Sequence, residues 1–291
     1  MADRPDLALA FSPDNWKPHK ALWKAHGERE GTRALIEVLL LARHLPHEHL
    51  PSWTAAGGQL THHHLIRPSI RPDGRVRQDD AMPQQTLPPS ESWRRIESWL
   101  ATHSASGLAL LNPPATPGEL RDAEQALGIR LPSDLADSLR CHNGLTTWAT
   151  LVPEQSPLPV GEIVDRWKTC MDVATENDGL TSRPWDDEPW WHPLWVPWAE
   201  SADGGAQVID QRPGPSEGRL GWAGHSGGGD FTDSWPGLAD LLHAVALALH
   251  DGGGVRGLHP YLATQGELWW DEVDCQELDG QPLTPAPIGL S

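Results

Sequence analysis

Residues 190–210 read WWHPLWVPWAESADGGAQVID, and this stretch decides the fold. Two segments rich in aromatic and β-branched residues, LWVPWAE at 194–200 and AQVIDQR at 206–212, flank the turn Asp203-Gly204-Gly205. Aromatic and β-branched residues favour strands, whereas Asp and Gly favour tight turns. A third segment, GRLGWAG at 218–224, follows Pro-Gly-Pro. The pattern predicts an antiparallel meander of three strands.

Helices are predicted on both sides of this meander. ESWRRIESWLATH from Ser92 places Trp93, Ile96, Trp99 and Leu100 on one helical face. Thr116-Pro117-Gly118-Glu119 has the form of a capping box with proline at the first helical position, and Gly128 is expected to end that helix.

Two more helices complete the prediction. One begins at Ser133, after Pro132, and Asn143-Gly144 fits a left-handed stop. The other is capped by Ser234, with Leu238, Leu241, Leu242, Val245 and Leu249 facing inward. Helices first, strands in the middle and a closing helix predict an α+β fold, with helices packed on one face of an antiparallel sheet.

The domain boundaries follow from changes in pattern. We predict a helical segment over 1–50, a disordered linker over 51–91 that is rich in Pro and Gly, a folded domain over 92–251 and a C-terminal extension over 252–291. ELWWDEV at 267–273 could add a strand to this extension.

Charge is distributed unevenly along the chain. Of 22 Lys/Arg and 40 Asp/Glu, residues 1–90 hold 11 and 10, which leaves 11 basic and 30 acidic residues in 91–291. Such a domain repels phosphate backbones and attracts basic partners over long range, so nucleic acid is not the expected ligand. A surface that is acidic only for solubility is the alternative.

The expected location is the cytoplasm. No apolar run approaches the roughly 20 residues of a membrane span, and no secretion signal is visible. The 3 cysteines, Cys141, Cys170 and Cys275, are widely spaced and lack a CxxC pair. This favours a reducing compartment over a disulfide framework or a zinc ribbon.

Catalytic and metal-binding patterns are weak. Cys141 adjoins His142, but adjacent residues near a helix end point in different directions, and HSGGGD at 225–230 lacks the Lys-Ser/Thr of a P-loop. His47, His49 and His62–His64 lie in or beside the predicted linker without Cys or acidic partners. We therefore expect no catalytic residue, no metal and no cofactor.

The tryptophans leave three readings open: core packing, a partner-binding surface, or a sugar-stacking platform. Strand alternation puts Val196 and Trp198 on one face of the sheet and Trp195 and Pro197 on the other. Trp190 and Trp191 precede the strand beside Asp186, Asp187 and Glu188. Exposed tryptophan ringed by polar groups is typical of an interface anchor. We expect these residues, with Asp230, to form partner contacts.

Residues from about Ser92 to Asp251 resemble the SUKH superfamily, which includes fungal cell-wall-assembly regulators and bacterial immunity proteins. The resemblance rests on several pieces in family order: the helix before Leu131-Pro132, the helix running into Asn143-Gly144, the strand with Trp195 and Pro197, the turn Asp203-Gly204-Gly205, the strand ending at Asp210, the strand with Gly221, and the closing helix. Proline-rich PEQSPLP at 153–159 departs from the pattern.

The segment from Trp16 to Leu50 resembles a different family, the C-terminal region of IstA-type insertion-sequence transposases. The catalytic core of that family is absent here, so no transposase activity is implied. We expect a short remnant of an insertion element.

The SUKH resemblance implies a non-catalytic protein-binding module, of the immunity type, that docks on a cognate toxin with a basic surface. An intracellular regulatory scaffold of the cell-wall-assembly-regulator type is the first alternative. A sugar-binding or hydrolytic enzyme that uses the tryptophans is the second. The excess of 18 Arg over 4 Lys suggests a GC-rich bacterial genome.

Overall fold

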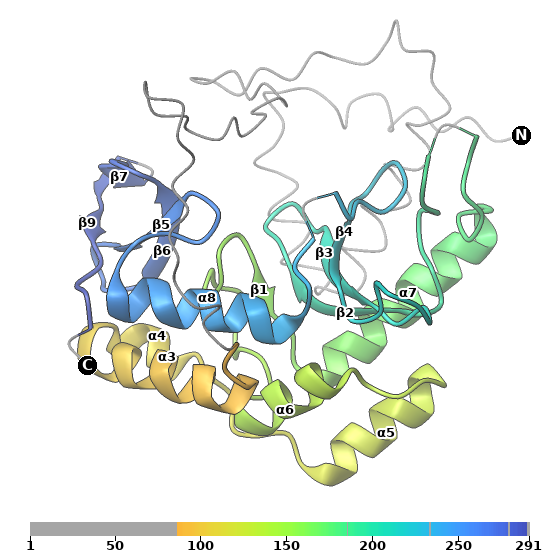
Figure 1. The fold of residues 1–291 in the computed structure, drawn as a ribbon, viewed down its shortest axis with the longest axis horizontal. Helices are drawn as coiled ribbons and strands as arrows, with labels where there is room; N and C mark the ends of the chain where they lie inside the picture. Colours follow the sequence, from red (N-terminus) through yellow and green to blue (C-terminus); the bar gives the residue numbers. More distant parts are fainter. Residues whose placement is uncertain (1–85, 185, 233, 279, 290–291) are drawn as a thin grey trace, which may run out of the picture.

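The computed structural model describes residues 86–184, 186–232, 234–278 and 280–289 (Figure 1). The predicted helical segment 1–50 and nearly all of the predicted linker lie outside these ranges. The first described helix starts at Pro89, slightly before Ser92.

Helices and strands come in the order that the α+β prediction requires. The helices are α3 (Pro89–His103), α4 (Ala105–Ala109), α5 (Pro117–Leu127), α6 (Ser133–Cys141), α7 (Val160–Glu176) and α8 (Leu238–Asp251). The strands are β1 (Ser156–Pro157), β2 (Trp195–Glu200), β3 (Ala206–Asp210), β4 (Leu220–Ala223), β5 (Leu258–Leu262), β6 (Leu268–Glu272), β7 (Glu277–Leu278), β8 (Gln281–Pro282) and β9 (Thr284–Pro285).

The predicted meander is confirmed. Strands β1, β2, β3 and β4 lie in that order in one sheet, and each pair is antiparallel. In the register of β2 and β3, Trp195 pairs with Asp210 and Val196 pairs with Ile209, and a bulge follows Pro197. A proline removes one ladder hydrogen bond, which fits its place at an irregularity.

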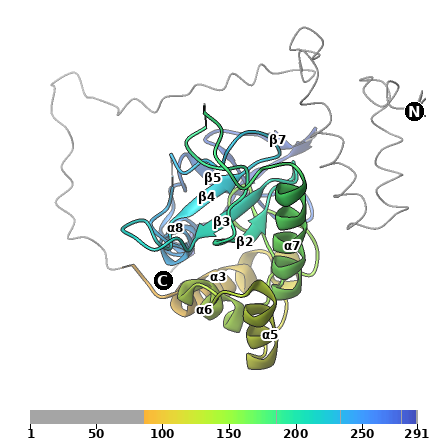
Figure 2. The ribbon, with the colours of Figure 1, turned by 90° about the vertical axis from the view of Figure 1, so that its right-hand side faces the viewer.

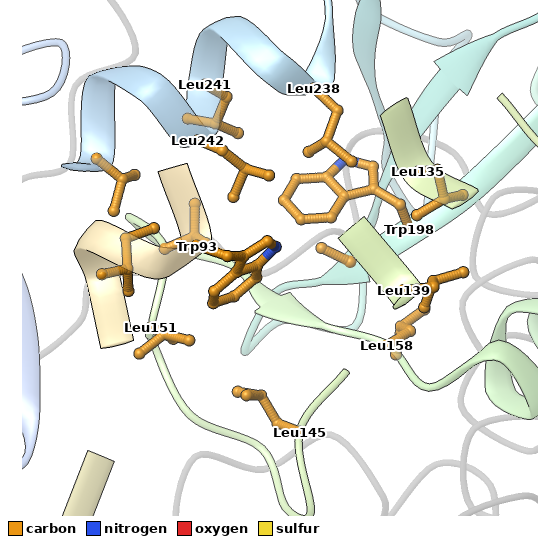
Figure 3. Close-up of a cluster of buried hydrophobic side chains, with 14 of the residues drawn as sticks. Trp93, Leu135, Leu139, Leu145, Leu151, Leu158, Trp198, Leu238, Leu241 and Leu242 are labelled. Carbon is orange, nitrogen blue, oxygen red and sulfur yellow. The ribbon is translucent and has the colours of Figure 1, made fainter. Parts of the chain in front are cut away.

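One face of this sheet builds the main core against helices. Val196, Trp198, Ile209 and Leu220 join the buried faces of α3, α5, α6 and α8 in a single cluster. Figure 3 shows Trp93 of α3 and Trp198 of β2 lying among leucines of α6 and α8. Helices α3 and α8 run side by side (Figure 1). The α+β fold with helices on one face is therefore confirmed.

The opposite face of the sheet is also covered. Trp195, Ala206, Val208 and Ala223 form a second cluster with Trp190, Trp191 and the C-terminal half of α7. Helix α7 stands beside the meander in Figure 2. No helix was predicted over 160–176, although Val160, Ile163, Val164, Cys170 and Ala174 are buried at helical spacing. Its apolar period is that of an amphipathic helix.

The predicted helix boundaries have mixed outcomes. Thr116 and Glu119 form the predicted capping box, and Gly128 ends α5 in the left-handed conformation, with φ of 71°. The prediction that Ser234 caps the closing helix is wrong. Helix α8 begins after Gly237, which has no side chain to cap with.

The prediction that Asn143-Gly144 stops α6 is also wrong in its mechanism. The helix ends at Cys141, with His142 as an extended cap. Asn143 instead caps the next helix, since its Oδ1 accepts a hydrogen bond of 2.7 Å from the Val160 amide. Gly144 has φ of 64°, and a Cβ there would lie 2.3 Å from the Leu158 carbonyl carbon. Close approach of two backbones therefore requires this glycine.

The Asp203-Gly204-Gly205 turn forms as predicted. The Asp203 carboxylate accepts a hydrogen bond of 2.9 Å from the Gly205 amide, and Gly204 has φ of 83°. Gly205 and Gly221 give room to aromatic rings: a Cβ at either position would lie within 2.2 Å of the Trp222 or Phe231 ring, respectively. Pro132 is buried immediately before α6.

Residues 252–289 share the core of the domain. Strands β6, β5 and β9 form a second antiparallel sheet, and Val255, Leu268 and Trp270 belong to the main cluster. The indole of Trp270 donates to the Leu151 carbonyl, and that of Trp99 donates to the Pro287 carbonyl. Within the described ranges, no helix is both long enough and apolar enough to span a bilayer.

Candidate interaction surface

The tryptophans before β2 are buried, so the prediction that Trp190 and Trp191 are exposed is wrong. Their exposed fractions are 8% and 1%. Trp191 packs edge-on against Trp195 with ring centroids 6.0 Å apart, and its amide donates to the Gly179 carbonyl just after α7. Helix α7, which was not predicted, supplies the apolar side chains that cover these tryptophans. Trp195 and Trp198 are also buried, on opposite faces of the sheet.

An ion network, here called the ion clamp, holds the loop before these tryptophans. It consists of Glu188, Asp210, Arg212 and Arg219. Arg212 bonds Glu188 at 2.6 Å and Asp210 at 2.7 Å, while Arg219 reaches both carboxylates at 3.2 Å. The Asp210 side chain is 2% exposed and that of Glu188 is 18% exposed. Glu188, predicted as a partner contact, therefore uses both carboxylate oxygens inside the domain.

The charged groups of the ion clamp shift each other's pKa values toward the charged forms. Burial raises the pKa of Asp210, but hydrogen bonds from Arg212 and Arg219 outweigh it, so the net pKa is lowered. The hydrogen bonds that Arg212 donates to Glu188 and Asp210 raise the pKa of Arg212. Burial, followed by the Arg212 cation, lowers the pKa of the nearby His192. These shifts favour the charged forms of Asp210 and Arg212 and the neutral form of His192.

Aromatic rings complete the support beneath the clamp. The Arg219 guanidinium lies 4.1 Å from the Phe231 ring centroid, and that of Arg212 lies 5.6 Å from the Trp195 ring centroid. Cation–π contacts of this kind orient arginine where water is partly excluded. The clamp thus ties the loop before β2 to the sheet and to the segment after β4.

The loops 186–189 and 225–230, far apart in sequence, lie against each other. The Gly229 amide donates to the Pro189 carbonyl at 2.9 Å, and the Trp190 indole donates to the His225 carbonyl at 3.1 Å. A Cβ at Gly228 would lie 2.1 Å from the Glu188 carbonyl oxygen and 3.2 Å from Asp186 Cβ. The glycine-rich HSGGGD segment therefore serves close packing of the two loops.

These loops carry three carboxylates at their outer side. Asp187 and Asp230 are exposed and Asp186 is partly exposed. Asp230 also pairs with Trp222 through its backbone, and its carboxylate accepts from the Thr232 amide. We call Asp186, Asp187 and Asp230 the acidic rim. The structure thus brings together three of the predicted contact residues and assigns Glu188, Trp190 and Trp191 to the base that holds them.

The rest of the described surface adds to the negative field. Arg94, Arg95, Arg140 and Arg166 are each paired with a carboxylate, as are the two arginines of the clamp. No Lys or Arg follows Arg256 in the sequence, whereas Glu267, Asp271, Glu272, Asp274 and Glu277 do. Basic side chains are therefore largely engaged within the domain, which leaves the acidic excess outward.

The cysteines are unsuited to nucleophilic work. Burial raises the pKa of Cys170 to about 11, and burial with the nearby Glu97 and Asp137 charges raises that of Cys141. The pKa of Cys275 is raised as well, by burial first and then by Asp271. A thiol acts as a nucleophile through its thiolate, so these shifts lower the reactivity of all three thiols, and that of buried Cys170 most of all.

Cys141 and His142 diverge as expected. The Cys141 thiol donates to the Asp137 carbonyl, whereas the His142 ring faces Glu97 and the Asn112 carbonyl. The described part of the chain holds no group of three or more His, Cys, Asp or Glu side chains placed to bind a metal ion. His47, His49 and His62–His64 lie outside the described residues.

Taken together, the fold and this surface define an α+β domain whose acidic loops are fixed on a rigid aromatic and ionic base. The model of the SMI1 / KNR4 family (SUKH-1) matches residues 114–243. This segment is therefore a SUKH domain, and it contains the meander, the ion clamp and the acidic rim.

Two curated relatives agree with this assignment. The chain is 30% identical over 89 residues to the KNR4/SMI1 homolog of Kluyveromyces lactis, which covers 28% of this chain and 17% of that protein. It is 38% identical over 53 residues to the KNR4/SMI1 homolog of Eremothecium gossypii, covering 18% and 8%. The chain thus matches less than a fifth of either relative. Both organisms are fungi, so bacterial origin stays a prediction.

Proposed function

We propose that this chain is a non-catalytic protein-binding module that recognises a basic partner through its acidic rim. The observation that carries this proposal is the way the rim is built. Three carboxylates project from two loops that are locked by the ion clamp and by buried Trp190 and Trp191. A charged surface whose loops are already held in place loses little conformational entropy on binding. Complementary charge also raises the association rate.

The particular role we propose is that of an immunity protein, which neutralises a toxin by covering its basic functional surface. A nuclease is a fitting target, because enzymes that bind nucleic acid present positive surfaces that an acidic protein can occupy. The proposal needs no reactive group in the domain, in keeping with the raised thiol pKa values.

Co-expression tests the immunity role directly. The full chain is produced in cells together with candidate toxins, beginning with any that is encoded beside its gene, and survival is scored. Protection is expected from the wild-type chain and should be lost in Asp186→Asn/Asp187→Asn/Asp230→Asn. A matched variant, Asp122→Asn/Glu272→Gln/Asp274→Asn, removes three exposed charges elsewhere and should still protect. Absence of protection by the wild-type chain would refute the immunity role.

A regulatory scaffold of the cell-wall-assembly-regulator type is the second candidate. The matches to fungal KNR4/SMI1 homologs favour it. Such a scaffold would bind its partner through the same rim without inhibiting it. A partner that copurifies with the chain but keeps its activity in the complex would therefore select the scaffold over the immunity protein.

A sugar-binding or hydrolytic role has less support. Stacking on a sugar requires exposed aromatic faces, whereas Trp190, Trp191, Trp195 and Trp198 are each at most 8% exposed. Oligosaccharide binding that is lost in Trp190→Ala, with the fold retained, would restore this alternative.

A further inference from the structure

A second acidic feature lies away from the rim, at the junction of two helices and the sheet. A groove of about 480 Å³ runs between the start of α6, the start of α8 and the turn between β3 and β4. Its exposed lining is mainly polar and includes Asp134, Glu217 and Asp240, whereas Pro132, Ile209 and Leu238, which also border it, are buried. The groove shares no residue with the rim.

The three carboxylates of the groove have no cationic partner within the described ranges. None of them lies within ion-pair distance of a described Lys or Arg. Asp134 accepts only a long bond of 3.4 Å from the Ala239 amide. A polar groove lined by uncompensated carboxylates suits an arginine-rich segment, because guanidinium groups form paired hydrogen bonds with carboxylates.

The chain itself leads to this groove. Thr86, the first described residue, donates its hydroxyl to the Asp240 carboxylate at 2.8 Å. Just before it in the sequence, residues 67–77 read RPSIRPDGRVR and place Arg67, Arg71, Arg75 and Arg77 within one short segment. Eight residues lie between Arg77 and Thr86, and a chain of that length can span up to about 30 Å.

We propose that residues 67–77 bind in the groove of their own chain, with the arginines paired to Asp134, Glu217 and Asp240. Tethering makes even a weak contact effective, because short linkers give effective concentrations on the order of millimolar. The bound segment would neutralise part of the acidic surface and compete with basic ligands for the groove. This inference does not depend on the function proposed above.

Amide chemical shifts in the isotope-labelled full chain test the contact. The reporters are Gly218 and Gly237 in the groove, with Gly128 at the end of α5 as the reference for an intact fold. Arg67→Gln/Arg71→Gln/Arg75→Gln/Arg77→Gln should move the groove amides and leave Gly128 in place. Salt at about 0.5 M, which screens charge pairs, should move the wild-type groove amides in the same direction.

A matched variant keeps the test specific. Arg4→Gln/Lys17→Gln/Lys20→Gln/Lys24→Gln removes four cations from a more distant part of the chain and should leave Gly218 and Gly237 unchanged. Glu217→Gln, which changes an exposed groove residue, should reduce the response to the four-arginine change. Identical groove amides in the wild-type chain and the four-arginine variant would overturn the proposal. Equal shifts in both charge variants would overturn it as well.

Discussion

The two faces of the four-stranded sheet are both covered, but by different chemistry. The face with Val196 and Trp198 packs against helices in the main hydrophobic core. The face with Trp195 and Val208 packs against α7 and two tryptophans, and an ion clamp lies at its margin. The first face stabilises the domain, whereas the second also fixes the loops that carry the acidic rim. Charged loops can therefore be anchored by the face beneath them when that face is built as a core.

The apolar face should show the largest effect of a single substitution. Trp198→Ala removes a large buried side chain, and we expect a loss of about 3–5 kcal/mol in the free energy of unfolding, measured with urea. Trp148→Ala, at a residue that is 39% exposed, is the control and should change stability by less than about 0.5 kcal/mol. Similar losses in the two variants would contradict the placement of Trp198 in the core.

The ion clamp should give a smaller and pH-dependent effect. Asp210→Asn weakens charged hydrogen bonds to Arg212 and Arg219, and we expect a loss of about 1.5–3 kcal/mol at pH 7. Because the folded pKa of Asp210 lies below its ordinary value of 3.8, the carboxylate contributes its stability above that value and loses it as pH falls through the folded pKa.

The difference in the free energy of unfolding between the wild-type chain and Asp210→Asn should therefore shrink as the pH is lowered below about 4. Urea unfolding at several pH values measures this difference. A difference that stays constant down to pH 2 would show that the charge of Asp210 does not act through the clamp.

A substitution at Gly144 tests whether this glycine is needed because the Leu158 backbone passes close to it, rather than to end helix α6. Gly144→Val places a branched side chain at positive φ against the Leu158 backbone. The free energy of unfolding should therefore fall by more than about 1 kcal/mol. Gly161→Ala, where a Cβ meets nothing within 4 Å, should be neutral or slightly stabilising. An unchanged melting temperature for Gly144→Val would rule out the close approach.

Thiol reactivity reports on the second face without altering stability. With a pKa of about 11, only about one in a thousand Cys170 side chains is a thiolate at pH 8. The side chain is also buried, so a reagent cannot reach it in the folded protein. Ellman's reagent should label Cys275 and Cys141 in the native protein and Cys170 only after unfolding. Rapid labelling of Cys170 would mean that α7 does not seal this face.

Local signals predicted most of the main core. The Thr116–Glu119 capping box, the apolar face of α8 and the turn at Asp203–Gly205 each depend on residues close in sequence, and each is confirmed. Ser234 was assigned as a cap because of its residue type alone, but the chain continues through Gly237 before turning into the helix.

The base of the acidic rim could not be predicted in the same way. Trp190 and Trp191 look exposed beside three acidic residues, and only the position of α7 shows that they are covered. The clamp joins Glu188 to Arg212 and Arg219, residues 24 and 31 positions away. No period or motif links such distant charges, so their pairing emerges only when β3 and β4 are placed side by side.

The rate at which the chain associates with a basic partner tests the central claim most directly. Stopped-flow mixing with a basic protein partner, such as a toxin for which co-expression shows protection, should give an association rate constant about tenfold lower for Asp186→Asn/Asp187→Asn/Asp230→Asn at low salt. The matched variant Asp122→Asn/Glu272→Gln/Asp274→Asn should differ from wild type by less than about twofold. Equal slowing by both variants, or no slowing by either, would contradict the assignment of the acidic rim as the binding surface.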